Sequence, residues 1–490
     1  MSPERTTIRG VPARRMITGL WQMADQERDG RSLDLDRAAE ALVAYARAGF
    51  DTFDMADHYG SAEIVAGMAH KILRDAGEAA PTILTKWCPA PGPMTADVVR
   101  RGVETSLRRL NLDRVDVMQF HWWRYEDERY LDALRALNDL RVEGLIGGIG
   151  LTNFDAAHLD LVARYGIEVT SNQVSFSLID RRAAGELSDV ARQHGIGLLA
   201  YGTLSGGFLS ARYVGASDKP PVDWSRSKYR RFIEQAGGWD AFQNLLSVLG
   251  TIADKHGISI SNVATRWVLD HRAVTAIIVG ARLGENEHRD DNLAVFSFAL
   301  DDGDRAEIDA ALTTMPAIPG DCGDEYRRPP FLTASGDLSH HLDALPPIFG
   351  TTVSRSRSDR SWAKSGSVWE DAAGFSRAIR RGNRILVSGT TATDAHGDCV
   401  CPGDAGGQAQ FILDKIVAAV TSLGGAREDI LRTRIYMTDT SQWQAVSAAH
   451  RRMFRDILPA NTLIGIDALV GDGYLVEIEA EAEVGDNGGA

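Results

Sequence analysis

The sequence predicts an α/β protein in which a closed barrel of parallel strands and helices precedes a smaller α+β domain. Short apolar runs recur eight times between residues 16 and 281, and segments with helical spacing of apolar residues separate them. Strands that alternate with amphipathic helices form a parallel sheet covered by helices. Eight such units in about 280 residues fit a closed (β/α)8 TIM barrel better than an open sheet.

The expected barrel strands are the apolar runs at 16–21, 50–56, 82–87, 115–122, 146–153, 169–176, 196–202 and 275–281. Between the third and fourth runs, Val99, Val103, Leu107 and Leu110 share one face at helical spacing, with arginines opposite. No GxGxxG motif follows the first run, so a Rossmann domain is not expected.

Four residues near the ends of the early strands carry acid–base chemistry. Asp54, Lys86 and His121 fall at the ends of three expected strands, and Tyr59 lies in the loop that follows one of them. The C-terminal ends of barrel strands meet at one rim, where enzymes of this fold hold their active sites. An ammonium beside a phenol favours the phenolate and lowers the pKa of the phenol. We therefore expect Lys86, paired with Asp54, to help Tyr59 protonate a carbonyl oxygen that His121 aligns.

Two later strand ends carry groups suited to an amide ligand. Thr152 and Asn153 end the fifth expected strand, and Gln173 lies near the end of the sixth. Their hydroxyl and amide groups can donate to and accept from a carboxamide. The sequence therefore predicts that this part of the rim binds one.

Two further segments suit phosphate groups. The turn from Gly202 to Gly207, which includes Leu204, can aim backbone N–H groups at a pyrophosphate. After the eighth strand, Gly280 precedes Arg282, whose guanidinium can hold a phosphate with two hydrogen bonds. We expect these residues to contact a phosphorylated cofactor.

The motifs FDMADHYG (53–60), LTKW (84–87) and QFHW (119–122) resemble those of the aldo-keto reductase family. The likeness runs over roughly residues 10–315 and includes the four acid–base residues without substitution. It implies that these four are the catalytic tetrad of an NAD(P)H-dependent oxidoreductase. The implied substrate is a small carbonyl compound, whether an aldehyde, a ketone, a sugar or a biosynthetic intermediate.

The resemblance also assigns cofactor contacts. It implies that Tyr201 stacks on the nicotinamide and that the residues near Thr152 hold the nicotinamide amide. Asp291 and Asn292 match the pair that contacts adenine in the family. Arg282 favours a cofactor with a 2′-phosphate, so NADPH is preferred and NADH is the alternative.

The expected domain organisation has four parts. The barrel spans 1–316, an extension at 317–349 folds back over its rim, 350–367 is a linker, and 368–490 is the second domain. The Ser/Arg-rich composition of 350–366 favours a flexible linker. Residues 203–240 form an insertion that either shapes the substrate mouth or is a surface excursion.

The second domain is expected to contain strands at 384–390, 432–439, 461–469 and 475–484, with a helix over 407–425. It contains the motifs GFSRAIRRGNRILVSG (374–389), GGAREDILRTRIYMTD (424–439), PANTLIGI (459–466) and VEIEAEAEV (476–484). In this order they resemble the reactive-intermediate deaminase (Rid, or YjgF-like) family, which has a chorismate-mutase-like α+β fold. The resemblance implies a homo-oligomer, a trimer formed through this domain. Asn461 stands where active members carry a carboxylate-binding arginine and Phe375 replaces a tyrosine, whereas Glu477 is kept. We therefore expect an assembly or ligand-binding role for this domain.

Composition and charge bear on the partners, the location and the metal content expected for this protein. The net charge of −14 and a pI near 5.4 argue against nucleic-acid binding. No signal sequence or membrane span is expected, so a cytoplasmic enzyme is predicted. The four cysteines form no metal pattern and are predicted to be free thiols, with no metal site. Two alternatives stay open: a nucleotide-binding redox sensor, or a reductase fused to an active imine hydrolase.

Overall fold

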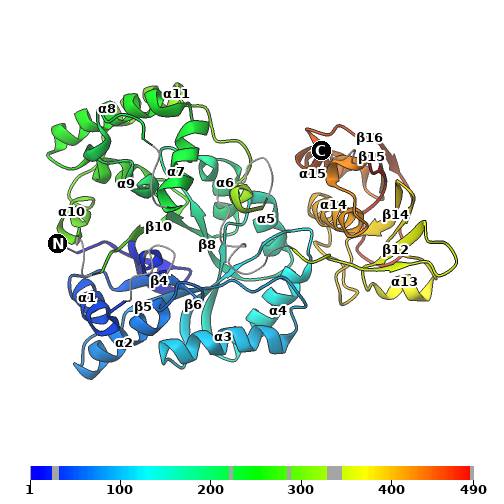
Figure 1. The fold of residues 1–490 in the computed structure, drawn as a ribbon, viewed down its shortest axis with the longest axis horizontal. Coiled ribbons are helices and arrows are strands. Elements are labelled where there is room, and N and C mark those ends of the chain that lie inside the picture. Colours follow the sequence, from blue (N-terminus) through cyan, green and yellow to red (C-terminus); the bar gives the residue numbers. More distant parts are fainter. Residues whose placement is uncertain (1, 25–32, 220–223, 284–287, 328–344, 486–490) are drawn as a thin grey trace.

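The computed structural model describes residues 2–24, 33–219, 224–283, 288–327 and 345–485. Figure 1 shows a barrel ringed by helices and, beside it, a smaller domain formed by the C-terminal part of the chain. The fold class expected from the sequence is confirmed, because the first part is a closed parallel barrel and the second a separate α+β unit.

The barrel strands all form where the apolar runs predicted them. They close in the order β10-β3-β4-β5-β6-β7-β8-β9, and every neighbouring pair is parallel. Their bounds are β3 Met16–Gly19, β4 Thr52–Ala56, β5 Thr82–Trp87, β6 Val115–His121, β7 Ile146–Thr152, β8 Val169–Ser175, β9 Gly197–Tyr201 and β10 Val274–Gly280.

The helices that accompany the barrel follow from the amphipathic segments between its strands. They are α1 Leu35–Arg47, α2 Ala62–Asp75, α3 Ala96–Leu110, α4 Arg129–Val142, α5 Ala156–Arg164, α6 Glu186–Gln193, α7 Trp224–Gln235, α8 Gly238–His256, α9 Ile260–Leu269, α10 Arg289–Ala294, α11 Asp302–Thr313 and α12 Asp324–Arg327. Helix α3 begins where the Thr95 side chain accepts the Val98 N–H and ends at Asn111, whose φ of 52° is left-handed. It buries the apolar face predicted from its spacing.

A two-stranded hairpin closes the barrel at the N-terminal ends of its strands. It consists of β1 Arg5–Ile8 and β2 Val11–Arg14. The fully buried Ile8 packs with Leu84, Val117 and Leu199 of three barrel strands. Because this end is filled by side chains, the opposite rim is the one available to ligands.

The second domain is a seven-stranded sheet with helices. The sheet has the order β11-β12-β13-β14-β17-β15-β16. Its strands are β11 Gly350–Val353, β12 Arg360–Lys364, β13 Ala378–Arg381, β14 Arg384–Thr391, β15 Ile430–Met437, β16 Ala460–Gly465 and β17 Val476–Glu483, and its helices are α13 Val368–Ala372, α14 Ala405–Ser422 and α15 Trp443–Phe454. Helix α14 packs against β14 and β17.

The expected linker at 350–367 is wrong for half of its length. Residues 350–353 and 360–364 are β11 and β12, which pair antiparallel and join the sheet through β13. All four β11 residues are exposed, and in β12 only Ala363 is buried. The edge strand β11 and its neighbour β12 bury so little apolar surface that their composition resembles that of a linker.

The two domains meet along α4 and α5 of the barrel and α14 of the second domain, with α5 packed directly on α14 (Figure 1). Lys415 on α14 is buried and pairs with Glu128 across 2.9 Å. At the C-terminal end of α5, the Tyr165 hydroxyl donates to Asp394 Oδ2 across 2.7 Å. Within the described ranges, no helix has the length and apolar character needed to cross a membrane.

Candidate active site

A cavity of about 640 Å³ opens at the C-terminal ends of the barrel strands. Every residue predicted for catalysis or cofactor binding lines it: Asp54, Tyr59, Lys86, His121, Thr152, Asn153, Gln173, Tyr201, Gly202, Leu204, Gly280, Arg282, Asp291 and Asn292. The strand-end argument and the family resemblance together therefore bring all of these residues to one cavity, although their contacts differ in part from those expected.

Asp54 and Lys86 form a buried ion pair at the ends of the adjacent strands β4 and β5. Lys86 Nζ lies 2.7 Å from Asp54 Oδ2 and also donates to the Met55 carbonyl across 2.9 Å. Both side chains are almost fully buried. A buried ammonium needs a compensating charge, and Asp54 supplies it while holding Lys86 in one place.

Tyr59 lies beside this ion pair. Lys86 Nζ is 4.9 Å from the centre of the Tyr59 ring, and Trp21 packs edge-on against the phenol with 4.8 Å between ring centres. His121, at the end of β6, packs edge-on against Trp123 at 4.6 Å. The phenol, the ammonium and the imidazole thus line one cavity, as the expected acid–base chemistry requires.

Gln173 has a different environment from the one predicted for it. Its Nε2 donates to Asp54 Oδ1 and to Gln119 Oε1, each across 2.7 Å. Gln119 Nε2 also donates to Asp54 Oδ1 across 2.7 Å. Two amides therefore fix the carboxylate that holds Lys86. Sequence reasoning missed Gln119, although it lies two residues before His121 and so on the same side of β6.

Thr152, Asn153 and Tyr201 line the adjoining wall. Among the atoms that the structure describes, the buried Thr152 Oγ1 has no hydrogen-bond partner. Asn153 adopts a left-handed φ of 58°, and its Oδ1 accepts from the Tyr201 hydroxyl across 2.9 Å. Burial raises the pKa of Tyr201, so its hydroxyl remains a donor. A hydroxyl with unused bonding capacity beside an amide fits the expected carboxamide ligand.

The segment expected to hold phosphates forms another wall of the cavity. Gly202 has a φ of +69°, and a Cβ there would lie 2.6 Å from the Tyr229 hydroxyl oxygen, so only glycine fits. Arg282 is exposed and donates from Nε to Gln22 across 3.1 Å. Asp291 accepts from Asn262 across 3.1 Å. These groups fit a phosphorylated nucleotide, because a glycine turn and a guanidinium line the same cavity.

Two residues that sequence reasoning did not select complete the rim. Lys228 of α7 donates to the Tyr326 hydroxyl across 2.6 Å. The ring of Tyr326, on α12, lies 6.0 Å from that of His121, and its hydroxyl is 3.3 Å from that of Tyr201. Lys228 comes from the predicted insertion at 203–240 and Tyr326 from the predicted extension at 317–349, two segments that were expected to lie near the mouth or rim of the barrel. Residues 328–344 of that extension lie outside the described residues.

Two predictions concern cysteines and metals. All four cysteines are free thiols in the structure. Asp57, His58 and Cys88, beside the cavity, place one ligand atom each within 4.8 Å of one another. The expected lack of a metal therefore stays a prediction.

The comparisons with known proteins agree with this geometry. Residues 15–313 match the aldo/keto reductase family, and residues 367–484 match the family described as endoribonuclease L-PSP. The chain is 25% identical to the NADH-specific methylglyoxal reductase of Escherichia coli (strain K12), over 59% of this chain and 92% of that protein. It is 30% identical to the glyoxal reductase of Bacillus subtilis (strain 168), over 56% of this chain and 83% of that protein.

A solved structure supports the same fold. The glycerol dehydrogenase of Gluconobacter oxydans superposes with a TM-score of 0.56 at 24% identity, covering 66% of this chain and 98% of that protein. The first family match covers more than half of this chain and falls where the motifs resemble the aldo-keto reductases. The second match falls on the domain whose motifs resemble the Rid, or YjgF-like, family. The chain therefore belongs to the aldo/keto reductase family, carries a YjgF-like domain at its C-terminus, and is an oxidoreductase.

Proposed function

We propose that the protein reduces the carbonyl group of a small molecule with NADPH, and that Tyr59 is its general acid. The arrangement of Asp54, Lys86 and Tyr59 carries this proposal, because a buried ion pair places an ammonium 4.9 Å from the centre of the phenol ring. The glyoxal and methylglyoxal reductases among the relatives support small aldehydes and ketones as substrates.

The reduced nicotinamide, when bound, supplies the hydride that the carbonyl carbon accepts. The Tyr59 hydroxyl gives its proton to the carbonyl oxygen, which completes the alcohol. Lys86 stabilises the phenolate that remains, and Asp54 keeps Lys86 in position. His121 holds the carbonyl oxygen against the Tyr59 hydroxyl. In the oxidative direction Tyr59 is the base that takes the alcohol proton.

For the cofactor, we assign the nicotinamide to the wall formed by Thr152, Asn153 and Tyr201, and the phosphates to the walls at Gly202 and Arg282. Arg282 supports a 2′-phosphate and therefore NADPH, since its guanidinium lines the cavity and can bind a phosphate with two hydrogen bonds. Because one relative is described as NADH-specific, the preference of this protein must be tested by comparing its NADPH and NADH binding. Arg282→Ala should weaken NADPH binding far more than NADH binding. Equal losses for the two cofactors would contradict the NADPH preference.

For the second domain we propose a role in assembly as a homotrimer. The barrel packs on α14, on the helical side of the sheet, and Leu386 and Ile464 of the sheet are 45% and 43% exposed. Exposed apolar side chains on an uncovered sheet indicate a contact surface. Sedimentation should give the trimer mass, and Leu386→Glu should shift it toward the monomer. A monomeric wild-type protein would overturn this proposal.

The catalytic proposal is tested by replacing Tyr59 with phenylalanine. Tyr59→Phe should lower kcat at least about a hundredfold on aldehydes and ketones, while NADPH still binds. Tyr165→Phe is the matched control, because it also removes a phenol hydroxyl but lies outside the cavity. A wild-type rate in Tyr59→Phe would refute the assignment. Tight NADPH binding without turnover on any carbonyl would instead favour a nucleotide-binding sensor.

A further inference from the structure

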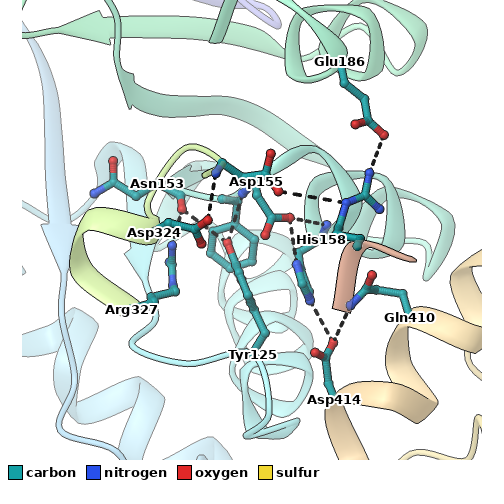
Figure 2. Close-up of polar contacts among 12 residues, drawn as sticks. Tyr125, Asn153, Asp155, His158, Glu186, Asp324, Arg327, Gln410 and Asp414 are labelled. Carbon is teal, nitrogen blue, oxygen red and sulfur yellow. Dashed lines mark hydrogen bonds and ion pairs between the residues drawn. The ribbon is translucent and has the colours of Figure 1, made fainter. Parts of the chain in front are cut away.

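A chain of buried polar contacts runs from the second domain to the cofactor wall of the cavity (Figure 2). It begins at Asp414 on α14, the central helix of the second domain. Asp414 Oδ2 lies 2.8 Å from His158 Nε2, and His158 Nδ1 lies 2.7 Å from Asp155 Oδ1. The His158 side chain on α5 is completely buried. At this point of the interface, a histidine of the barrel is therefore held between one carboxylate from each domain.

This arrangement keeps His158 charged. Burial lowers the pKa of the imidazole, but Asp155 and Asp414 outweigh that effect and raise the pKa to about 9. An imidazolium donates from both ring nitrogens, whereas neutral imidazole donates from one. Gln410 Nε2 donates to Asp414 Oδ2 across 3.2 Å and so orients it. At neutral pH both carboxylates thus receive a charged hydrogen bond.

The contacts continue from Asp155 into the cavity wall. Asp155 Oδ1 accepts the His158 backbone N–H across 2.8 Å and so caps α5. The Asp155 backbone N–H donates to the Tyr125 hydroxyl across 3.0 Å, and that hydroxyl donates to the Asn153 carbonyl across 3.3 Å. The Tyr125 ring also stacks on His158, with 3.4 Å between ring centres and 6° between planes. His158 therefore contacts both Asp155 and Tyr125, two residues whose hydrogen bonds hold the turn at residues 153–155.

The turn needs such support because Asn153 is strained. A residue other than glycine at a φ of 58° persists only where its surroundings hold it. Arg327 adds to this support, since it donates to the Asn153 carbonyl across 2.5 Å and lies 4.4 Å from the centre of the Tyr125 ring. The Asn153 side chain in turn accepts a hydrogen bond from the Tyr201 hydroxyl, and both residues line the cavity at the wall assigned to the nicotinamide.

We propose that Asp414 of the second domain is a positioning residue for the cofactor site of the barrel. Through His158 and Asp155 it holds the 153–155 turn in the conformation that binds the nicotinamide end. This inference rests on the proposed function, since it assumes that the cofactor binds at this wall. Coupling of this kind is reciprocal, so bound cofactor also strengthens the docking of the second domain.

The test compares three substitutions by their dissociation constants for NADPH, measured by fluorescence titration without substrate. Asp414→Asn keeps the shape of the side chain and removes its charge. It should weaken NADPH binding about fivefold or more, while kcat at saturating NADPH changes less. Tyr165→Phe is the control, because it removes a hydrogen bond between the domains at the other end of the same helix. Its NADPH affinity should equal that of the wild type.

Tyr125→Phe tests the route and stays informative if Asp414→Asn folds poorly. It removes the hydroxyl that joins Asp155 to Asn153, so this single substitution should also weaken NADPH binding. Added to Tyr125→Phe, Asp414→Asn should cause little further loss, because the contact it acts through is already broken. Circular dichroism and thermal unfolding identify any variant that is misfolded.

The outcomes separate this inference from the proposed function. Wild-type NADPH affinity in Asp414→Asn, or an equal loss in Tyr165→Phe, would overturn the positioning role even where the wild-type enzyme binds NADPH and turns over carbonyls. Fully additive losses from Asp414→Asn and Tyr125→Phe would overturn the route through the hydroxyl. Absence of NADPH binding by the wild-type protein would refute the proposed function itself.

Discussion

Raising the pH from about 6 to above about 9 should weaken the contact between the two domains at His158. The buried imidazole lies between Asp155 and Asp414, and its pKa rises from 6.5 to about 9 in the folded protein. A group whose pKa is raised by folding contributes stability that is fully present below the unfolded pKa and is lost as the pH rises through the folded pKa. The contribution is therefore complete below about 6.5 and disappears as the pH passes about 9.

The size of the effect follows from the same values. Each pKa unit corresponds to about 1.4 kcal/mol, so an increase from 6.5 to about 9 gives about 3 kcal/mol. Among the described residues, the other ionisable groups near the histidine and its two carboxylates include Tyr125 stacked on it, Tyr130 of α4, Arg452 of α15, which interacts with Asp155, and Arg327 over Tyr125. Burial raises the pKa of both tyrosines well above the ordinary phenol value, so they stay neutral over this range.

The assay is an NMR titration of protein labelled with 13C at the histidine ring, with the His158 signal assigned by its loss in His158→Gln. The signal should titrate near pH 9 in the wild type and at a lower pH in Asp414→Asn, which removes one carboxylate. In parallel, denaturant unfolding at pH 6 and pH 9.5, values chosen about three units below and just above the expected pKa, should show a larger loss of stability in the wild type than in Asp414→Asn. A His158 signal that titrates below about pH 7 would refute the reasoning.

Three further substitutions test the cavity. Lys86→Met leaves Asp54 buried without its counter-charge and should lower stability by about 3–5 kcal/mol and abolish turnover; an active enzyme of unchanged melting temperature would contradict the ion-pair argument. Gly202→Ala should cost about 1–2 kcal/mol from its left-handed φ alone, displace Tyr229, and weaken NADPH binding in a fluorescence titration; unchanged binding would remove this turn from the site. Tyr326→Phe removes an acceptor of the buried Lys228 ammonium. It should raise KM for the carbonyl substrate about tenfold or more, roughly the effect of one charged hydrogen bond, with little change in NADPH affinity; an effect on NADPH alone would place Tyr326 at the cofactor instead.

The barrel could be predicted because its signals are local. Parallel strands are buried on both faces and so appear as apolar runs, and their C-terminal ends share one rim. Asp54, Lys86 and His121 could therefore be brought together without knowledge of the helices between them. Glycine and arginine after later strands extended the same argument to the cofactor walls.

The remaining features depend on contacts between distant segments. Lys228 and Tyr326 reach the cavity from α7 and α12, which have no fixed relation to a strand end. Gln173 was placed in the cavity, but its hydrogen bonds depend on Asp54 and Gln119 of two other strands. The strands at 350–364 bury too little apolar surface to show a strand pattern. The pairing of His158 with Asp414 of the second domain could not be predicted, because neither residue belongs to a recognisable motif.

Helix α12 shows that the boundary between the two family matches is not a neutral place to cut or join the chain. The first match ends at residue 313, yet Tyr326 lines the cavity and Arg327 donates to Trp122 and Asn153. A chimera joined at residue 313 would inherit the four acid–base residues and lose one wall of the chamber around them. Any exchange of the second domain must therefore keep residues 314–327 with the barrel, as part of the enzyme and not of its partner.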